Sequence, residues 1–255
     1  MSTTPKRRGT GGSEDGPSEV APGVYRFGGD RVNWYVVADD ADELTVVDAG
    51  FPTHWEMLVE GLDDLGYGLD DVAALVLTHG HADHVGFAER LRSRGVTVYG
   101  HEADRDLFES GGGPVPRDLL RNLWRPAVLT YFVGVLRAGG ASIDPVAAFE
   151  PMADEDVLDV PGRPEVRHLP GHSLGQCALV LADRDVVLAG DALATTDLRY
   201  RDRPGPQIPF VAADHELARE SAARLEDLGE VVLLPCHGEP WSGEASEAVR
   251  LALRR

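Results

Sequence analysis

The sequence has little of several features that mark particular classes of protein. No run of about 18 apolar residues occurs in its 255 residues, so it predicts no membrane-spanning helix. Its two cysteines, Cys177 and Cys236, are too few for a disulfide-built fold, and a chain of this length needs none. Lysine occurs once, at Lys6, and arginine supplies every other strong base. The chain must therefore fold around an ordinary hydrophobic core.

Acidic residues outnumber basic ones in the sequence. The formal net charge is −19 and the pI is about 4.7, a balance that repels nucleic-acid phosphates and anionic membranes. We therefore expect a small-molecule substrate, and neither a nucleic acid nor a membrane as partner. The excess of acidic residues and the single lysine have two explanations: adaptation to high salt, or a genome that favours arginine codons. The sequence leaves both open.

The first residues differ from the rest of the chain. Residues 1–19 are polar and rich in glycine, serine, threonine and proline, and no apolar segment follows Lys6-Arg7-Arg8. This pattern predicts a disordered tail rather than a signal peptide, and so a cytoplasmic protein. Residues 20–255 carry the apolar periodicity of one large α/β domain, and the chain is 43% hydrophobic, enough for a core.

Short apolar runs that fit β-strands alternate with stretches of helical spacing. Trp55, Leu58, Leu62 and Leu65, for example, recur as on one face of a helix over 54–65. Strands are predicted at 24–27, 32–37, 44–47, 73–77, 96–99, 157–160, 165–169, 177–181, 185–189 and 231–234, and further helices from 85 onward, over 214–228 and over 244–253. Both halves run from strands to a helix and on to a strand, so we expect two sheets with helices outside.

Residues 103–142 form a segment of different character. Apolar pairs such as Leu119-Leu120 and Phe132-Val133 recur at helix-like intervals, and Pro126 is placed to start or kink a helix. We interpret the segment as a helical insertion on a strand-rich frame. Three roles remain open for it: a roof over an apolar pocket, a core helix, or the contact of a homodimer.

Three histidines and an aspartate stand directly after the predicted buried strand 73–77, at His79, His81, Asp83 and His84. Side chains two residues apart at the end of a strand point the same way, so His79 and His81 can approach one ion. A tight turn can aim the other two at a neighbouring ion, and imidazole nitrogen and carboxylate oxygen are good zinc ligands. The structural alternative is a helix N-terminus capped by Asp83. Four liganding groups within six residues favour a metal site.

Three later residues share one design, in which an apolar strand delivers a ligand-type side chain next to a glycine. They are His172, Asp191 and His237. Each alone is a weak signal, because single histidines are usually structural and Gly-Asp is a common turn. Together they indicate that several strand ends converge on one rim of the fold.

This combination resembles the signature of the metallo-β-lactamase superfamily, in its glyoxalase II-like branch, in order and spacing across residues 24–241. The resemblance implies a four-layer αββα sandwich with two metal ions at one edge, two Zn²⁺ in the first instance, with iron or manganese as alternatives. Carried over by position, it assigns His79, His81 and His172 to one ion, Asp83, His84 and His237 to the other, and Asp191 to both.

Two further residues near the motif have more than one interpretation. Asp48 matches a supporting aspartate of the family, and it equally fits a carboxylate in a strand-end turn. Cys236 precedes His237 where glycine is frequent in the family. It is either a thiolate that contacts the site or a small buried residue.

The resemblance implies a hydrolase in which a hydroxide between two ions attacks an ester, thioester, lactone or similar bond. Asp83 lies beside the attacking water in that arrangement and is the candidate for proton transfer. The chain departs from glyoxalase II at residues 171–176, Gly-His-Ser-Leu-Gly-Gln, where that branch often reads Gly-His-Thr-Pro-Gly-His. Glyoxalase II also binds glutathione with a C-terminal helical domain. In this sequence, two predicted helices and a strand take up most of the residues after Asp191, so little is left for such a domain.

Three further functions and a set of substrate contacts complete the expectations. A mononuclear iron persulfide dioxygenase of the same fold needs only His79, His172 and Asp191. The ligands also suit a β-lactamase, whereas a non-enzymatic binding protein of this fold usually lacks some of them. Arg199 and Tyr200 are candidates to reach an anionic substrate group, in a segment that continues through 201–203, and Trp241 is a candidate to pack under the site.

Overall fold

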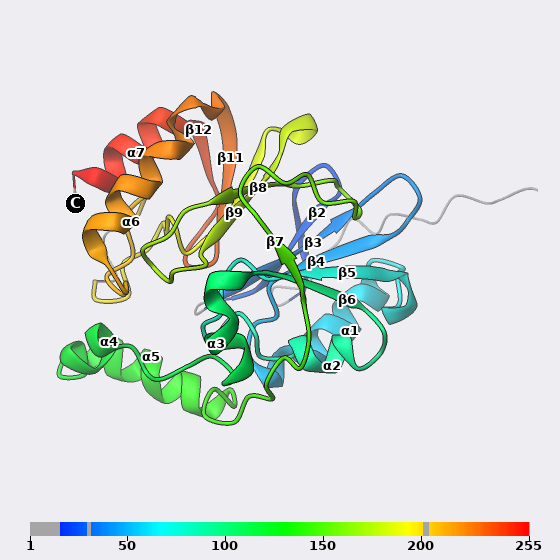
Figure 1. The fold of residues 1–255 in the computed structure, drawn as a ribbon, viewed down its shortest axis with the longest axis horizontal. Coiled ribbons are helices and arrows are strands. Elements are labelled where there is room, and N and C mark those ends of the chain that lie inside the picture. Colours follow the sequence, from blue (N-terminus) through cyan, green and yellow to red (C-terminus); the bar gives the residue numbers. More distant parts are fainter. Residues whose placement is uncertain (1–15, 30–31, 201–203, 255) are drawn as a thin grey trace, which may run out of the picture.

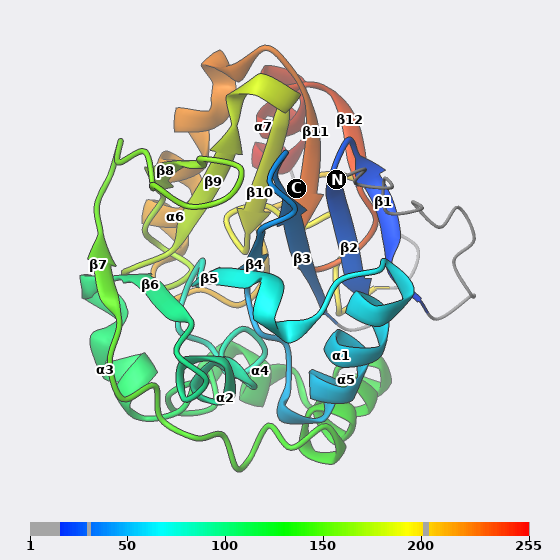
Figure 2. The same ribbon diagram turned by 90° about the vertical axis from the view of Figure 1, so that its right-hand side faces the viewer.

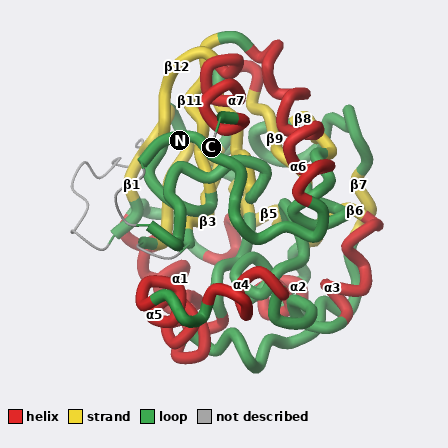
Figure 3. Tube along the Cα trace, turned by 90° about the vertical axis from the view of Figure 1, so that its left-hand side faces the viewer, coloured by secondary structure: helices red, strands yellow, loops and turns green. Residues whose placement is uncertain are grey.

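Two β-sheets face each other across the middle of the molecule, and helices cover their outer faces (Figure 1). The computed structural model describes residues 16–29, 32–200 and 204–254. A quarter-turn view shows the strands between one group of helices that includes α6 and α7 and another that includes α1 to α5 (Figure 3). The expected α/β sandwich with the layer order αββα is therefore confirmed.

The first sheet contains seven strands in sequential order. They are β1 (Ser18–Ala21), β2 (Val24–Gly28), β3 (Asn33–Ala38), β4 (Leu44–Val47), β5 (Val72–Val76), β6 (Thr97–His101) and β7 (Glu150–Met152). Neighbours from β1 to β4 are antiparallel, whereas β4 to β7 run parallel. The chain therefore forms a meander first and needs crossover connections afterwards.

The second sheet contains five strands in the order β12-β11-β10-β9-β8. They are β8 (Glu165–His168), β9 (Cys177–Leu181), β10 (Val186–Gly190), β11 (Glu230–Pro235) and β12 (Trp241–Glu244). Only the β10–β11 pair is parallel among these neighbours. Because β9 is antiparallel to both its neighbours, β8 and β10 point the same way. The carboxyl ends of β8, β10 and β11 thus lie at one edge (Figure 2).

The helices connect these strands. The α-helices are α1 (Trp55–Asp64), α2 (Ala88–Arg92), α3 (Arg105–Glu109), α4 (Arg117–Asn122), α5 (Pro126–Arg137), α6 (His215–Ala222) and α7 (Ala245–Leu253). Single 3₁₀ segments are η1 (Pro52–His54), η2 (Leu69–Asp71), η3 (Glu102–Asp104), η4 (Ala182–Arg184) and η5 (Ala223–Leu228). None of the helices in the described part of the chain is both long and apolar enough to cross a bilayer.

Alternation along the strands builds three apolar layers. In β3, Trp34 and Val36 belong to the cluster under α1 and α2, while Tyr35 and Val37 belong to the cluster between the sheets. Successive strand side chains point to opposite faces, so a strand buried on both sides reads as a continuous apolar run. The same split occurs in β10, and the outer face of the second sheet packs on α7 and η5. This apolar layer between the sheets holds them packed face to face.

The strands of the sequence interpretation are largely present, with differences at weakly patterned segments. The strand expected at 157–160 is wrong, because Val157 makes a single bridge to Glu165 and the chain turns at residues 161–164. The helix expected over 214–228 divides into α6 and η5. Of the expected tail, residues 1–15 lie outside the described residues, and Ser18 and Glu19 belong to β1. The insertion at 103–142 contains α3, α4 and α5.

A close backbone approach locks the loop after β5 against the end of β4. The Ala49 amide donates to the His84 carbonyl at 2.7 Å, and the Gly86 amide donates to the Gly50 carbonyl at 2.9 Å. A Cβ added at Gly86 would lie 2.3 Å from the Gly50 carbonyl oxygen and 2.4 Å from the Phe51 backbone. The contact therefore requires glycine at position 86.

We expect Gly86→Ala to lower the free energy of unfolding by about 3 kcal/mol, because the new methyl group forces two backbone segments apart. Urea denaturation measures this loss. The matched control is Gly68→Ala, where the nearest atom to an added Cβ is an Asp71 carboxylate oxygen at 3.9 Å. An effect of Gly86→Ala no larger than that of the control would contradict the account of this contact.

Candidate metal centre

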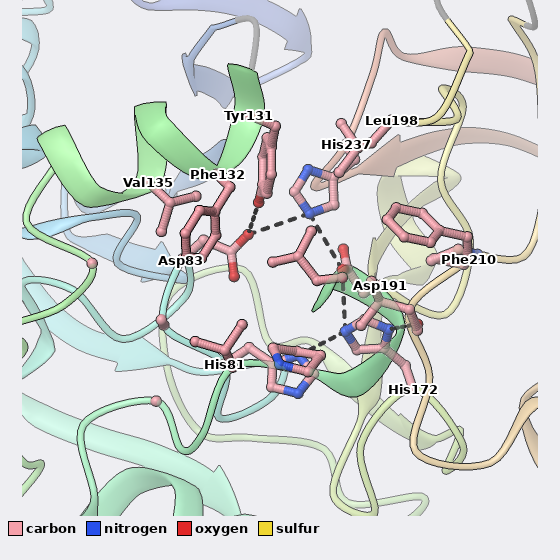
Figure 4. A pocket seen from close by; sticks show the side chains of 18 of the residues that line it. His81, Asp83, Tyr131, Phe132, Val135, His172, Asp191, Leu198, Phe210 and His237 are labelled. Carbon is pink, nitrogen blue, oxygen red and sulfur yellow. Dashed lines mark hydrogen bonds and ion pairs between the residues drawn. The ribbon is translucent and has the colours of Figure 1, made fainter. Parts of the chain in front are cut away.

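The seven ligand-type residues of the sequence interpretation lie together at one edge of the sandwich. Each follows a strand end: His79, His81, Asp83 and His84 follow β5, His172 follows β8, Asp191 follows β10, and His237 follows β11. Because these strands present their carboxyl ends to the same edge, segments far apart in sequence meet there (Figure 4). The structure thus contains a cluster of histidines and aspartates able to bind metal.

Two triads of this cluster have the closeness that a metal ion needs. The ligand atoms of His79, His81 and His172 lie within 4.8 Å of one another, and so do those of a second triad, Asp83, His84 and His237. Within the first, His81 Nδ1 is 2.8 Å from His172 Nε2. The two ring nitrogens therefore point toward each other, as the ligand atoms of one ion would.

Asp191 lies between the two triads. Its Oδ2 atom is 3.2 Å from His172 Nε2 and 3.3 Å from His237 Nε2, and its Oδ1 atom is 4.0 Å from His84 Nε2. Asp83 completes the second triad, with Oδ2 3.4 Å from His237 Nε2 and Oδ1 3.6 Å from His84 Nε2. The Asp191 carboxylate therefore faces histidines of both triads.

Hydrogen bonds behind the cluster select the tautomer of three histidines. His172 Nδ1 is 2.7 Å from the Val211 carbonyl oxygen, which only accepts, so this nitrogen carries the proton. His84 Nδ1 likewise donates to Asp48 Oδ2 at 3.0 Å. These partners leave the Nε2 lone pairs of both rings turned toward the centre.

A relay through Thr78 acts on His79 in the same way. The Thr78 hydroxyl donates to Asp48 Oδ2 at 2.8 Å, so it accepts from His79 Nδ1 at 3.2 Å. His79 Nε2 is then an unprotonated, buried atom. In the described part of the chain it has no hydrogen-bond partner, nor do the buried His84 Nε2 and Asp191 Oδ1. Buried polar atoms without partners are rare and costly, and here they face one point, which fits a divalent cation.

Asp48 is the support of both triads. It is fully buried, adopts the left-handed backbone conformation with φ of 64°, and also accepts from the Thr78 amide at 2.8 Å. Aspartate is among the non-glycine residues that adopt this conformation most readily. The Cys236 thiol donates to Asp48 Oδ2 at 3.2 Å, and burial raises the pKa of Cys236 well above its ordinary value. Cys236 is therefore a buried, protonated residue behind the site.

Burial and the neighbouring carboxylates shift the pKa values of the clustered histidines in opposite directions. Burial lowers the pKa of His172 to about 3. Burial acts in the same direction on His84, but the carboxylates of Asp48 and Asp83 outweigh it and raise the pKa of His84 to about 9. Asp191 keeps a pKa below its ordinary value despite burial, because His237 and His172 face it. A metal ion at these nitrogens would take the place of such protons.

The sequence interpretation missed Asp104, which joins the two ligand loops. Its buried carboxylate accepts from the Gly80 amide at 2.9 Å, the Ser173 hydroxyl at 2.6 Å and the Gly175 amide at 2.7 Å. The first lies between His79 and His81, and the other two lie in the loop that carries His172. The sequence offered no local signal, because Asp104 stands among other charged residues, in His101-Glu102-Ala103-Asp104-Arg105-Asp106, just before a helix.

A pocket of about 150 Å³ opens beside the cluster. Its floor includes His81, Asp83, Asp191 and His237, and its walls come from α4, α5 and residues within 194–198 and 207–211. The Tyr131 hydroxyl reaches down from α5 and donates to Asp83 Oδ2 at 2.8 Å (Figure 4). The sequence interpretation gave Tyr131 no role of its own within the segment 103–142.

The three expected substrate contacts do not line this pocket. The Arg199 guanidinium pairs with Asp197 at 2.8 Å, and its central carbon lies 5.2 Å from the centre of the Phe210 ring. The Tyr200 ring packs against the Arg125 guanidinium. Trp241 belongs to β12, opposite Leu233, and lines a separate cleft. The expected continuation over residues 201–203 lies outside the described residues.

Comparison with known proteins agrees with the fold and the cluster. The family model of the metallo-beta-lactamase superfamily matches residues 27–237. The probable metallo-hydrolase YflN of Bacillus subtilis is 28% identical over 92% of each chain. The hydroxyacylglutathione hydrolase GloC of Haemophilus influenzae is 30% identical over 68% of this chain and 71% of its own.

Solved structures show the same architecture. A metallo-beta-lactamase family protein, TTHA1429 of Thermus thermophilus, superposes with a TM-score of 0.68 at 24% identity, over 92% of this chain and 80% of that one. TTHA1623, solved in a di-iron-bound form, gives a TM-score of 0.62 at 25% identity over 90% and 98% of the two chains. Fold and site together define an αββα protein with a metal-binding edge. The chain belongs to the metallo-β-lactamase superfamily.

We expect Asp104→Asn to destabilise the protein by about 2 kcal/mol, because all three partners are donors and the new amide NH₂ would face one of them. Metal affinity should fall about 10- to 100-fold, since both ligand loops lose their common support. Urea denaturation and competition with a chromophoric chelator measure the two effects. Asp106→Asn, an exposed change on α3, is the control. Wild-type metal affinity in Asp104→Asn would overturn the role assigned to Asp104.

Proposed function

We propose that the protein is a hydrolase with two metal ions, zinc in the first instance, that cleaves an ester, thioester, lactone or similar bond. The observation that carries the proposal is that three buried ligand atoms, His79 Nε2, His84 Nε2 and Asp191 Oδ1, lie close together and have no hydrogen-bond partner among the described residues. The two triads offer one ligand set each, with Asp191 between them. Nitrogen and carboxylate ligands in these numbers suit zinc, and they also suit iron or manganese.

Some residues would bind the ions, and others would hold the ligand loops in place. His79, His81 and His172 would hold one ion, and the second triad would hold the other, with Asp191 touching both. When bound, such a pair supplies a water of lowered pKa as nucleophile and polarises the scissile carbonyl. The chain's own residues set the positions of both, because Asp48 and Asp104 fix the ligand loops from behind.

Asp83 is the residue that would take and return a proton. Its carboxylate sits at the pocket floor, and its pKa lies well below the ordinary value; burial acts in the opposite direction, and the opposing histidines His84 and His237 outweigh it. The Tyr131 hydroxyl holds one carboxylate oxygen, which fixes the direction of the other. The carboxylate is therefore ionised and held in one direction, so it can accept a proton from the reacting group and later return it.

The mononuclear alternative uses fewer of these features. A persulfide dioxygenase would need His79, His172 and Asp191, and would leave Asp83, His84 and His237 without a task. Yet this second triad has its own buried support, since Asp48 orients His84 at 3.0 Å. Similarity to YflN, a probable metallo-hydrolase, and to GloC, a hydroxyacylglutathione hydrolase, further supports hydrolysis.

Metal content is the first test. We expect about two ions per purified chain, loss of ester or thioester hydrolysis on chelation, and recovery on adding Zn²⁺. Asp191→Ala should lower the bound metal and abolish hydrolysis, because one carboxylate serves both ions. Mass-spectrometric metal analysis and a chromogenic ester assay report these quantities.

The control is Asp183→Ala, which removes an exposed carboxylate from η4. Metal content and hydrolysis should match those of the unaltered protein. A single iron per chain with oxygen consumption on glutathione persulfide would replace the hydrolase by the dioxygenase.

Tyr131 gives a second test. Tyr131→Phe should leave about two ions bound and lower kcat about tenfold, because a hydrogen bond to a charged carboxylate is lost at the reacting centre. Thr130→Ala, an exposed change on the same helix, should not alter kcat. Unchanged kcat in Tyr131→Phe would show that the hydroxyl does not orient Asp83 for the reaction.

A further inference from the structure

The walls of the pocket are largely apolar and come from two segments on opposite sides of it. Phe132 and Val135 project from α5, and Leu198 and Phe210 approach from the other side (Figure 4). Leu119 of α4 and Phe210 belong to one buried cluster, against which Phe132 and Leu198 pack. The insertion is therefore one wall of a pocket that has the metal-ligand cluster as its floor.

The apolar lining continues outward to the molecular surface. Val115 and Leu136 both line the pocket and remain 44% and 48% exposed. With the buried Leu119 and Phe210, they give the pocket apolar lining residues both at the molecular surface and inside it. Large exposed apolar side chains next to a pocket mark a ligand path more often than a solvated surface.

The described residues that line the pocket supply no basic side chain other than the histidines of the cluster. Among its described lining residues there is no lysine or arginine, and the charged groups are Asp83, Asp191 and Asp197 beside the histidines. Arg199 follows the lining residue Leu198 but does not line the pocket, and its guanidinium is held by Asp197 and Phe210. A carboxylate on the far arm of a substrate would be buried without a counter-ion, and burial of an unpaired charge is strongly unfavourable.

We propose that the substrate is an uncharged ester, thioester or lactone that carries an apolar chain. This inference rests on the hydrolase function proposed above. The scissile carbonyl would lie at the cluster, and the chain would lie along Phe132, Val135 and Phe210. Water adds to the carbonyl carbon as the bond to the alcohol oxygen or thiol sulfur breaks, and the leaving group takes up one proton. The products are a carboxylic acid and an alcohol or thiol.

Chain length gives the proposal its quantitative test. The as-purified holoenzyme is assayed with p-nitrophenyl acetate, butyrate, hexanoate and octanoate. Each buried methylene contributes about 0.8 kcal/mol, so kcat/KM should rise about fourfold for each added CH₂ until the pocket is filled. Replacing the terminal methyl of hexanoate or octanoate by a carboxylate should lower kcat/KM by more than about 100-fold. A hydroxyacyl thioester of glutathione, which carries two carboxylates, should also be a poor substrate.

Two variants on the same helix locate the chain. Phe132→Ala should flatten the rise of kcat/KM with chain length, because it removes one wall. Leu129→Ala should keep the rise, because Leu129 is exposed and does not line the pocket. An intact rise in Phe132→Ala would place the chain elsewhere and overturn the proposed position.

Binding supplies a readout that does not depend on turnover. Uncharged alkyl amides of increasing length, titrated calorimetrically into the as-purified protein, should bind about fourfold more tightly for each CH₂. Hydrolysis without dependence on chain length would overturn this inference and leave the hydrolase. Length-dependent amide binding without hydrolysis of any ester or thioester would support the pocket and overturn the proposed function. Absence of both would overturn the two together.

Discussion

The structure depends on the need to satisfy seven buried or half-buried ligand atoms at one edge of a sandwich. Imidazoles and carboxylates in an apolar surrounding are stable only when each polar atom has a partner. On the side away from the pocket this condition is met by protein groups: Asp48, Thr78 and the Val211 carbonyl. On the side toward the centre, three buried atoms in the described residues have no partner. A cation is the group that would complete the arrangement.

The fold supplies the edge. Two sheets lie back to back, so their strands cannot shift without breaking the apolar layer between them. Parallel pairing of β4 with β5 and of β10 with β11 then brings Asp48, the 79–84 loop, Asp191 and His237 to the same rim. Asp104 and Asp48 add short connections between loops that are distant in sequence. Rigid strands place the ligands, and buried carboxylates set their directions, which is how precise sites are usually built.

The insertion α4–α5 has a separate task. It adds no ligand to the two triads, but Tyr131 contacts Asp83, and its apolar face forms a wall of the pocket. Of the three roles that its sequence left open, the structure favours the wall.

Some of this was predictable from the sequence because the signal was local. His79, His81, Asp83 and His84 stand beside an apolar strand, and strand, spacing and residue type all agree. Asp104, Tyr131 and Thr78 were not predictable as parts of the site, because only tertiary packing brings their oxygen atoms to their partners. Trp241 lies away from the pocket for the converse reason: four residues beyond His237 the chain has already turned into β12. The expected strand at 157–160 failed because apolar spacing over four residues fits a turn-bounded loop equally well.

Anomalous diffraction from crystals of the as-purified protein, recorded at the absorption edge of the metal found in it, tests the central claim most directly. The account predicts two peaks about 3.5–4 Å apart. One should lie within bonding distance of His79, His81 and His172, the other within that of Asp83, His84 and His237, and Asp191 should contact both. A single peak, or peaks away from these side chains in a fully folded protein, would contradict it.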